Sequence, residues 1–194
     1  STVGKLVMSK ASENLIPITL ELGGKSPCII DDDENFKTCV KRCLFGKLLN
    51  AGQTCIATDY LFIRNDLKER FIEESRIIID EFFGENPLNS DQMVKIINKK
   101  HFDRLKGLIK DEKILLGGNS DNETLKIEPT LIDVKSKNSK IMQEEIFGPI
   151  LPIMTYKNID EVIEYINDHE KPLACYIFSS NKIIQDKIIQ KCSF

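Results

Sequence analysis

The chain has 194 residues, of which 41% are hydrophobic and 29% are charged, as in a globular protein with one substantial core or two small ones. The net charge is -3 and no basic block occurs, which disfavours nucleic acid or an anionic membrane surface as a partner. No apolar run approaches the roughly 20 residues of a membrane span, and no stretch has the pattern of a signal peptide.

Strand-like and helix-like patterns alternate along the chain. Apolar residues at helical spacing predict helices over 1–14, 35–49, 67–83, 93–110, 159–167 and 181–191. Shorter apolar runs predict strands over 17–22, 26–30, 60–63, 114–116, 130–134, 150–156 and 173–179, with a tight polar turn over 117–122. This alternation predicts an α/β fold, an open three-layer sheet with helices on both faces.

A metal site is not expected, because the six cysteines form no C-x-x-C pair and only two histidines are present. Cys39 and Cys43 are four residues apart on a predicted helix, where free cysteines pack as small hydrophobic residues. His101 and His169 lie in charged or polar helical settings and are expected at the surface. The α/β pattern favours a reducing compartment over a disulfide framework.

Glu21 is the first candidate functional residue, in the stretch L-E-L-G-G-K. A glutamate between Leu20 and Leu22 in a strand points to the opposite side from its neighbours. It is either a solvated residue on an outer face or a carboxylate in a cleft, where desolvation would raise its pKa towards that of a general base. The pattern leaves both interpretations open.

Cys55 is the second candidate, in the run N-A-G-Q-T-C. This polar, glycine-containing setting is not typical of a cysteine packed in a core. A nucleophilic cysteine needs access and a stabilised thiolate, and its own backbone N–H could donate to an oxyanion. Neither histidine is a good candidate for its base, so Glu21 is the best candidate partner.

The third candidate is the stretch Q-E-E-I-F-G-P over 143–149, in which two adjacent glutamates precede an aromatic residue and Gly-Pro. The pattern indicates an ordered loop. From the residues alone it could also be an ordinary loop that buries Phe147.

Together these motifs resemble those of the aldehyde dehydrogenase superfamily, in the family's order and at its spacing. The glutamate motif is L-E-L-G-G-K-S-P at 20–27, the cysteine motif is L-L-N-A-G-Q-T-C-I-A at 48–57, and the cofactor loop is E-E-I-F-G-P at 144–149. The stretches over 101–109 and 171–181 resemble the class 3 branch, which includes the fatty aldehyde dehydrogenases. The resemblance covers the whole chain and implies an aldehyde dehydrogenase-like catalytic domain.

The resemblance implies NAD(P)-dependent oxidation of an aldehyde to a carboxylic acid. Cys55 would attack the aldehyde as the nucleophile, giving a thiohemiacetal and then a thioester, and Glu21 would activate the water that hydrolyses the thioester. The aldehyde is a small molecule, and neither its identity nor the choice between NAD and NADP follows from these residues.

The same resemblance implies the cofactor contacts. Glu145 would bind the nicotinamide ribose, and Phe147 would pack near the nicotinamide. The main chain of Leu22 and Gly23 would lie against the nicotinamide end of NAD. Gly4 would align with the last glycine of the family's nucleotide loop, at the start of a predicted helix where a glycine allows close approach of a ligand.

The resemblance also implies a domain division, with residues 1–22 as the C-terminal remnant of a nucleotide-binding domain and 23–194 as a catalytic domain truncated at its C-terminal end. We therefore expect a fragment of a larger enzyme that is inactive in isolation. The parent is expected to be a cytoplasmic homodimer, with membrane attachment only through a tail beyond Phe194.

Two alternatives stay open on the sequence. Cys55 and Glu21 could hydrolyse an activated ester without a cofactor, as a thiol esterase. The chain could also be a binding protein that keeps the fold without the activity. The second alternative is disfavoured because both catalytic residues are present.

Overall fold

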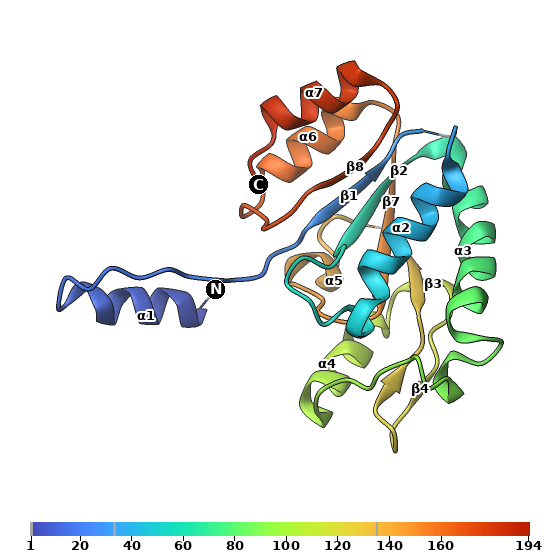
Figure 1. The fold of residues 1–194 in the computed structure, drawn as a ribbon, viewed down its shortest axis with the longest axis horizontal. Coiled ribbons are helices and arrows are strands. Elements are labelled where there is room, and N and C mark those ends of the chain that lie inside the picture. Colours follow the sequence, from blue (N-terminus) through green and yellow to red (C-terminus); the bar gives the residue numbers. More distant parts are fainter. Residues whose placement is uncertain (1, 33, 135) are drawn as a thin grey trace.

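A six-stranded sheet forms the centre of the computed structural model, which describes residues 2–32, 34–134 and 136–194 (Figure 1). The strand order is β3-β6-β7-β2-β1-β8. Neighbouring strands run parallel, except that the edge strand β3 is antiparallel to β6. The strands are β1 (Pro27–Ile30), β2 (Tyr60–Arg64), β3 (Lys113–Leu116), β6 (Thr130–Asp133), β7 (Ile150–Tyr156) and β8 (Tyr176–Phe178). A separate hairpin consists of β4 (Ser120–Asp121) and β5 (Lys126–Ile127).

Helices cover both faces of the sheet, and only α1 among the described helices lies away from it (Figure 1). The helices are α1 (Thr2–Ser12), α2 (Phe36–Leu48), α3 (Lys68–Phe83), α4 (Lys99–Ile109), α5 (Lys140–Gln143), α6 (Ile159–Asn167) and α7 (Lys182–Lys191), with short 3-10 turns at η1 (Leu49–Gly52), η2 (Asn65–Leu67) and η3 (Pro87–Asn89). Alternate residues of β1 divide between two cores: Cys28 and Ile30 pack with α2 and α3, whereas Ile29 packs with α4, α6 and α7. The predicted three-layer α/β fold is confirmed.

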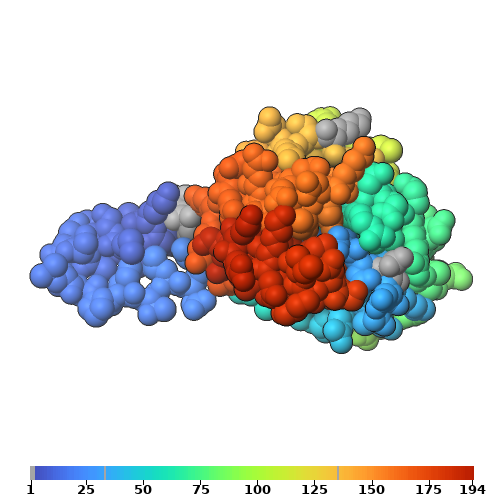
Figure 2. Space-filling view, turned by 90° about the horizontal axis from the view of Figure 1, so that it is seen from above, coloured from blue at the N-terminus to red at the C-terminus, as the bar shows by residue number. Residues whose placement is uncertain are grey.

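Helix α1 projects from the sheet domain, as the ribbon and the space-filling view both show (Figures 1 and 2). Residues 13–26 connect it to β1 without forming a helix or a strand. The predicted strand over 17–22 is therefore wrong. Its sequence suits a strand, but a strand needs a neighbour that completes its hydrogen-bond ladder, and no described strand pairs with this segment.

Two further sequence-based predictions are corrected by the structure. The helix predicted over 93–110 begins only at Lys99, where the Asn98 side chain caps it by accepting a hydrogen bond from the His101 N–H at 2.9 Å. The predicted tight turn over 117–122 is not a single turn, because residues 120–121 form strand β4 and pair with β5. Among the described residues, no helix combines the length and the apolar character needed to cross a bilayer.

Candidate functional site

Cys55 lies on an exposed turn between η1 and β2. After α2 ends, three successive residues take left-handed conformations: Asn50 at φ 54°, Ala51 at φ 52° and Gly52 at φ 72°. Only glycine adopts this region without strain, so surrounding contacts must stabilise the loop. The chain then turns again, with a hydrogen bond of 3.0 Å from the Ala57 N–H to the Thr54 carbonyl. This path presents Cys55 to solvent at the tip of the turn.

The Gln53 side chain anchors this turn to the segment before α4. Its amide nitrogen donates to the Lys95 carbonyl at 3.1 Å, and its amide oxygen accepts from the Ile97 N–H at 2.9 Å. On the other side of the turn, the Tyr176 hydroxyl of β8 donates to the Ile56 carbonyl at 2.5 Å. The turn that carries Cys55 is therefore braced from two directions. These bonds also explain why the segment before Lys99 is not helical.

The cysteine turn packs directly on the E-E-I-F-G-P loop. A Cβ atom built on Gly52 would lie 2.2 Å from the Gly148 carbonyl oxygen, so only glycine fits between the two backbones. Phe147 has a φ of 51° and is 39% exposed. The interpretation of this stretch as an ordinary loop around a buried Phe147 is therefore wrong.

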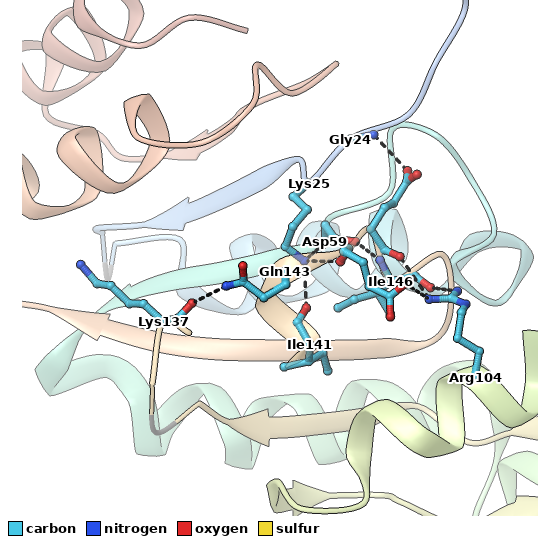
Figure 3. Close-up of polar contacts among 10 residues, drawn as sticks. Gly24, Lys25, Asp59, Arg104, Lys137, Ile141, Gln143 and Ile146 are labelled. Atoms are coloured by element: carbon cyan, nitrogen blue, oxygen red, sulfur yellow. Dashed lines mark hydrogen bonds and ion pairs between the residues drawn. The ribbon is translucent and has the colours of Figure 1, made fainter. Parts of the chain in front are cut away.

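A buried ion pair joins all three sequence motifs (Figure 3). The Lys25 ammonium pairs with the Asp59 carboxylate and also donates to the carbonyls of Ile141 and Glu144, at 3.0 and 2.9 Å. The other carboxylate oxygen of Asp59 accepts from the Ile146 N–H at 2.9 Å. Lys25 belongs to the glutamate motif, Asp59 follows the cysteine turn, and their partners belong to the E-E-I-F-G-P region.

Glu145 faces the two glycines of the glutamate motif. The Gly24 N–H donates to its carboxylate at 3.1 Å, and a Cβ atom on Gly23 would lie 2.3 Å from the same oxygen. Burial raises the pKa of Glu145, while the Gly24 N–H, Lys25 and Lys47 oppose this increase. Gly23 and Glu145 are thus in close contact, and only glycine fits at position 23.

Arg104 of α4 fixes the backbone of the same loop. Its guanidinium donates to the Glu145 carbonyl at 3.3 Å and to the Ile146 carbonyl at 2.5 Å, and it lies 3.5 Å from the Glu144 carboxylate. A cavity of about 490 Å³ opens beside this loop. It is lined by residues 23–25, 142–145 and 169–171. The glycine backbone and the half-buried carboxylate at its wall are suited to hold a polar ligand such as a sugar.

The other predicted site residues lie away from this cluster. Glu21 is exposed on the connecting segment and makes no hydrogen bond or ion pair within the described part of the chain. Leu22 is also exposed and lines a groove that includes Leu20, residues 170–173 and Phe194. Gly4 is buried in the first turn of the projecting helix α1. The structure thus groups Cys55, Gly23, Glu145 and Phe147 through their loops, but not Glu21 or Gly4.

Sequence analysis did not identify Lys25, Asp59, Arg104, Gln53 or Lys47 as parts of the site. Four of these contact partners 40 or more residues away, or act through backbone atoms, and no local pattern predicts such contacts. Lys47 could have been identified from the sequence. It lies on the predicted apolar face of its helix, four residues after Cys43.

Comparisons with known proteins agree with the motifs. The model of the aldehyde dehydrogenase family matches residues 1–194. Aldehyde dehydrogenase family 3 member A2 of Mus musculus is 47% identical over 193 residues, which cover 100% of this chain and 40% of that relative. The dimeric NADP-preferring aldehyde dehydrogenase of Rattus norvegicus is 42% identical over 193 residues, covering 100% of this chain and 43% of that relative. The chain therefore spans about two fifths of the relatives it matches.

Solved structures show the same similarity. The substrate-bound state of AldH from Staphylococcus aureus superposes with a TM-score of 0.97 at 45% identity, covering 100% of this chain and 43% of that one. Betaine aldehyde dehydrogenase of Staphylococcus aureus, in complex with NAD+, superposes with a TM-score of 0.86 at 29% identity, covering 98% of this chain and 40% of that one. Because family 3 members are among the similar relatives, the resemblance to the class 3 branch is confirmed.

Proposed function

Because the chain belongs to the aldehyde dehydrogenase family, we propose that the full-length protein that carries it oxidises an aldehyde to a carboxylic acid with a nicotinamide cofactor. The observation that carries this proposal is the position of Cys55. It is an exposed thiol on a turn whose backbone is fixed by Gln53, Tyr176 and Gly148. A nucleophile on such a turn is accessible to substrate, while the backbone that carries it is held in place by its surroundings.

In the first step the Cys55 thiolate attacks the aldehyde carbon, and a C–S bond forms as the carbonyl π electrons move to oxygen. The backbone N–H of Cys55 donates to no acceptor in the described part of the chain, which supports its use as an oxyanion donor. A bound nicotinamide would supply the acceptor for the hydride that this carbon loses as its C=O bond re-forms, and Cys55 would then carry a thioester.

Glu21 acts in the second step, as the base that takes a proton from water. The hydroxide equivalent adds to the thioester carbon, the C–S bond breaks, and the Cys55 thiolate is released with the carboxylic acid. The position of Glu21 supports this role, because its carboxylate is exposed to solvent and lies two residues before Gly23 in sequence. Free acid, rather than an acyl thioester of coenzyme A, is then the product.

The residues at the cavity wall fit a nicotinamide ribose. Glu145 offers a half-buried carboxylate that can accept hydrogen bonds from sugar hydroxyls, and Gly23 leaves no side chain in front of it. We assign ribose binding to Glu145, packing near the nicotinamide to Phe147, and backbone contacts to Leu22 and Gly23. We assign Gly4 to the nucleotide loop. NAD is the proposed cofactor, and NADP is the alternative, as the name of the rat relative illustrates.

The separation of α1 and the connecting segment from the sheet supports a boundary between a nucleotide-binding part, residues 1–22, and a catalytic part, residues 23–194 (Figure 2). We further propose a homodimer, because the name of the rat relative describes it as dimeric.

Cys55→Ser and Glu21→Gln in the full-length protein test this proposal. With an aldehyde and NAD, Cys55→Ser should abolish NADH formation, and Glu21→Gln should slow turnover by about a hundredfold or more, as expected for loss of a general base. Hydrolysis of an activated ester without NAD, with no NADH formed by the wild type, would instead support the thiol esterase. NADH formation at the wild-type rate by both variants would rule out the proposed mechanism.

A further inference from the structure

Cys55 and Ile56 are the two central residues of a tight turn over 54–57. The Ala57 N–H closes this turn by donating to the Thr54 carbonyl at 3.0 Å. The Thr54 carbonyl and the Cys55 N–H belong to the same planar peptide unit, so this hydrogen bond also sets the direction of the Cys55 N–H. That N–H is the oxyanion donor proposed above.

A second hydrogen bond reaches the same turn from the edge of the sheet. The Tyr176 hydroxyl donates to the Ile56 carbonyl at 2.5 Å, across 120 residues of sequence. The Ile56 carbonyl and the Ala57 N–H are the two ends of one peptide unit. Tyr176 therefore holds the peptide unit that in turn holds the peptide unit of Cys55. Hydrogen bonds linked in this way polarise one another, which strengthens the last donor of the chain, the Cys55 N–H.

The fold itself does not require the Tyr176 hydroxyl. Tyr176 lies on β8 in register with Cys28 of β1, and its ring packs on the core between the sheet, α2 and α3. Phe178, on the same face of β8, packs on this core without a hydroxyl. Burial raises the pKa of Tyr176, so its phenol keeps the proton that it donates. The hydroxyl is therefore the one part of this side chain that serves the cysteine turn rather than the core.

We propose that Tyr176 is a positioning residue for the reaction, whose hydroxyl holds the 54–57 turn so that the Cys55 N–H faces the aldehyde oxygen. This inference rests on the roles proposed above for Cys55. The aldehyde oxygen becomes negatively charged as the C–S bond forms, and a donor that is fixed before the reaction stabilises this charge without reorganisation. Tyr176 acts through the main chain of the turn and does not itself touch the substrate.

The test uses Tyr176→Phe in the full-length protein, which removes the hydroxyl and keeps the ring. The value of kcat/KM for an aldehyde should fall about tenfold, less than the hundredfold or more expected when an oxyanion donor is removed entirely. The dissociation constant of NADH should stay within about twofold of wild type, because Tyr176 does not line the cavity beside Glu145. The limiting rate of Cys55 alkylation by iodoacetamide at high pH should also stay within about twofold, since displacement of iodide needs no oxyanion donor.

Two other tyrosines provide matched controls for the loss of a hydroxyl. Tyr156→Phe removes a hydrogen bond of 2.8 Å to the Asp31 carboxylate, at the end of β7 and β2, whereas the cysteine turn lies before the start of β2. Tyr165→Phe removes a buried hydroxyl that has no partner within the described part of the chain. Both variants should keep kcat/KM within about twofold of wild type, and Tyr156→Phe controls for a general loss of stability.

The outcomes separate this inference from the proposed function. NADH formation at the wild-type rate by Cys55→Ser would remove the proposed function, and the inference with it. If Cys55→Ser is inactive but Tyr176→Phe has the kcat/KM of wild type, or Tyr156→Phe loses as much, the inference is overturned while the proposed function stands. An equal loss in alkylation and in kcat/KM would show that Tyr176 acts on the thiol and would also overturn it. A loss in kcat/KM alone supports it.

A fluorinated tyrosine at position 176 tests the same hydroxyl without removing it, and decides the question if Tyr176→Phe does not fold. Fluorine makes the phenol more acidic, and a phenolate has no proton to donate to the Ile56 carbonyl. The alkaline limb of the kcat/KM profile should therefore begin at a lower pH than in the wild type, with NADH affinity unchanged. A pH profile identical to that of the wild type would contradict the role of Tyr176.

Discussion

The Lys25 ammonium and the Asp59 carboxylate form an ion pair in the interior of the protein, with side chains that are 15% and 3% exposed. Lys25 lies two residues before β1 and Asp59 lies directly before β2, so the pair forms where these two parallel strands begin. The same ammonium and carboxylate hold the backbone of residues 141–146. One pair of side chains thus fixes the relative positions of the glutamate motif, the cysteine turn and the E-E-I-F-G-P loop.

Asp59→Asn should therefore be strongly destabilising. It leaves the Lys25 ammonium buried without its counter-charge, and breaking a buried pair from one side costs about 3–5 kcal/mol. The matched control is Asp103→Asn, which removes an ion pair to Lys99 whose side chains are both more than half exposed. This control should change the free energy of unfolding by less than about 0.5 kcal/mol. Urea unfolding measures both; equal effects of the two substitutions would show that the Lys25–Asp59 pair does not organise the site.

Gly52→Ala should also destabilise the protein, by roughly 2 kcal/mol or more, because the new methyl group would meet the Gly148 carbonyl in a left-handed backbone conformation. Gly107→Ala is the matched control. It lies within α4 with open space around its Cα, so alanine should stabilise the helix by about 0.5–1 kcal/mol. Thermal unfolding of the two variants distinguishes these effects by sign. A neutral Gly52→Ala would mean that the two loops are not in close contact.

The buried Lys47 predicts a specific pH dependence of stability. Its pKa is about 8 in the folded protein against 10.5 for the ordinary side chain. Between these pH values the unfolded chain binds more protons than the folded one, so the contribution of Lys47 to the free energy of unfolding rises with pH. At neutral pH the buried ammonium lowers the stability of the fold by about 3 kcal/mol, and this penalty disappears as the pH rises.

Comparison of wild type with Lys47→Met isolates this effect from all other titrations. The variant should be more stable at pH 7, and its advantage should shrink as the pH rises from about 8 to 10.5. Lys100→Met, at an exposed position, should show no such trend. A constant difference between variant and wild type across this range would mean that the Lys47 ammonium is solvated or paired in solution.

Local patterns were sufficient to predict most of the fold. The strand over 150–156 and the helix over 159–167 have the predicted bounds, because a continuous apolar run and an apolar stripe at helical spacing identify buried elements directly. The segment 17–22 has an equally good strand pattern, but β structure depends on a partner and none of the described strands supplies it. Likewise the start of α4 depends on Gln53, which lies more than 40 residues away.

For the site, sequence motifs identified the residues but not how they are held. Cys55, Gly23, Glu145 and Phe147 were predicted, and the structure brings their loops together, whereas their chemical roles stay predictions. The Lys25–Asp59 pair joins positions 34 residues apart, and no periodicity signals such a contact. Lys47 could have been found, because a lysine on the apolar stripe of a helix violates the pattern that the rest of the stripe obeys.

The central claim is that Cys55 carries the acyl group and Glu21 releases it. The most direct measurement is mass spectrometry of the full-length protein, quenched in acid during turnover with an aldehyde and NAD. Glu21→Gln should accumulate the acyl mass on the peptide that contains Cys55, the wild type should show less of it, and Cys55→Ser should show none. An unmodified Cys55 peptide in Glu21→Gln during turnover, or an acyl group on a different residue, would contradict this account.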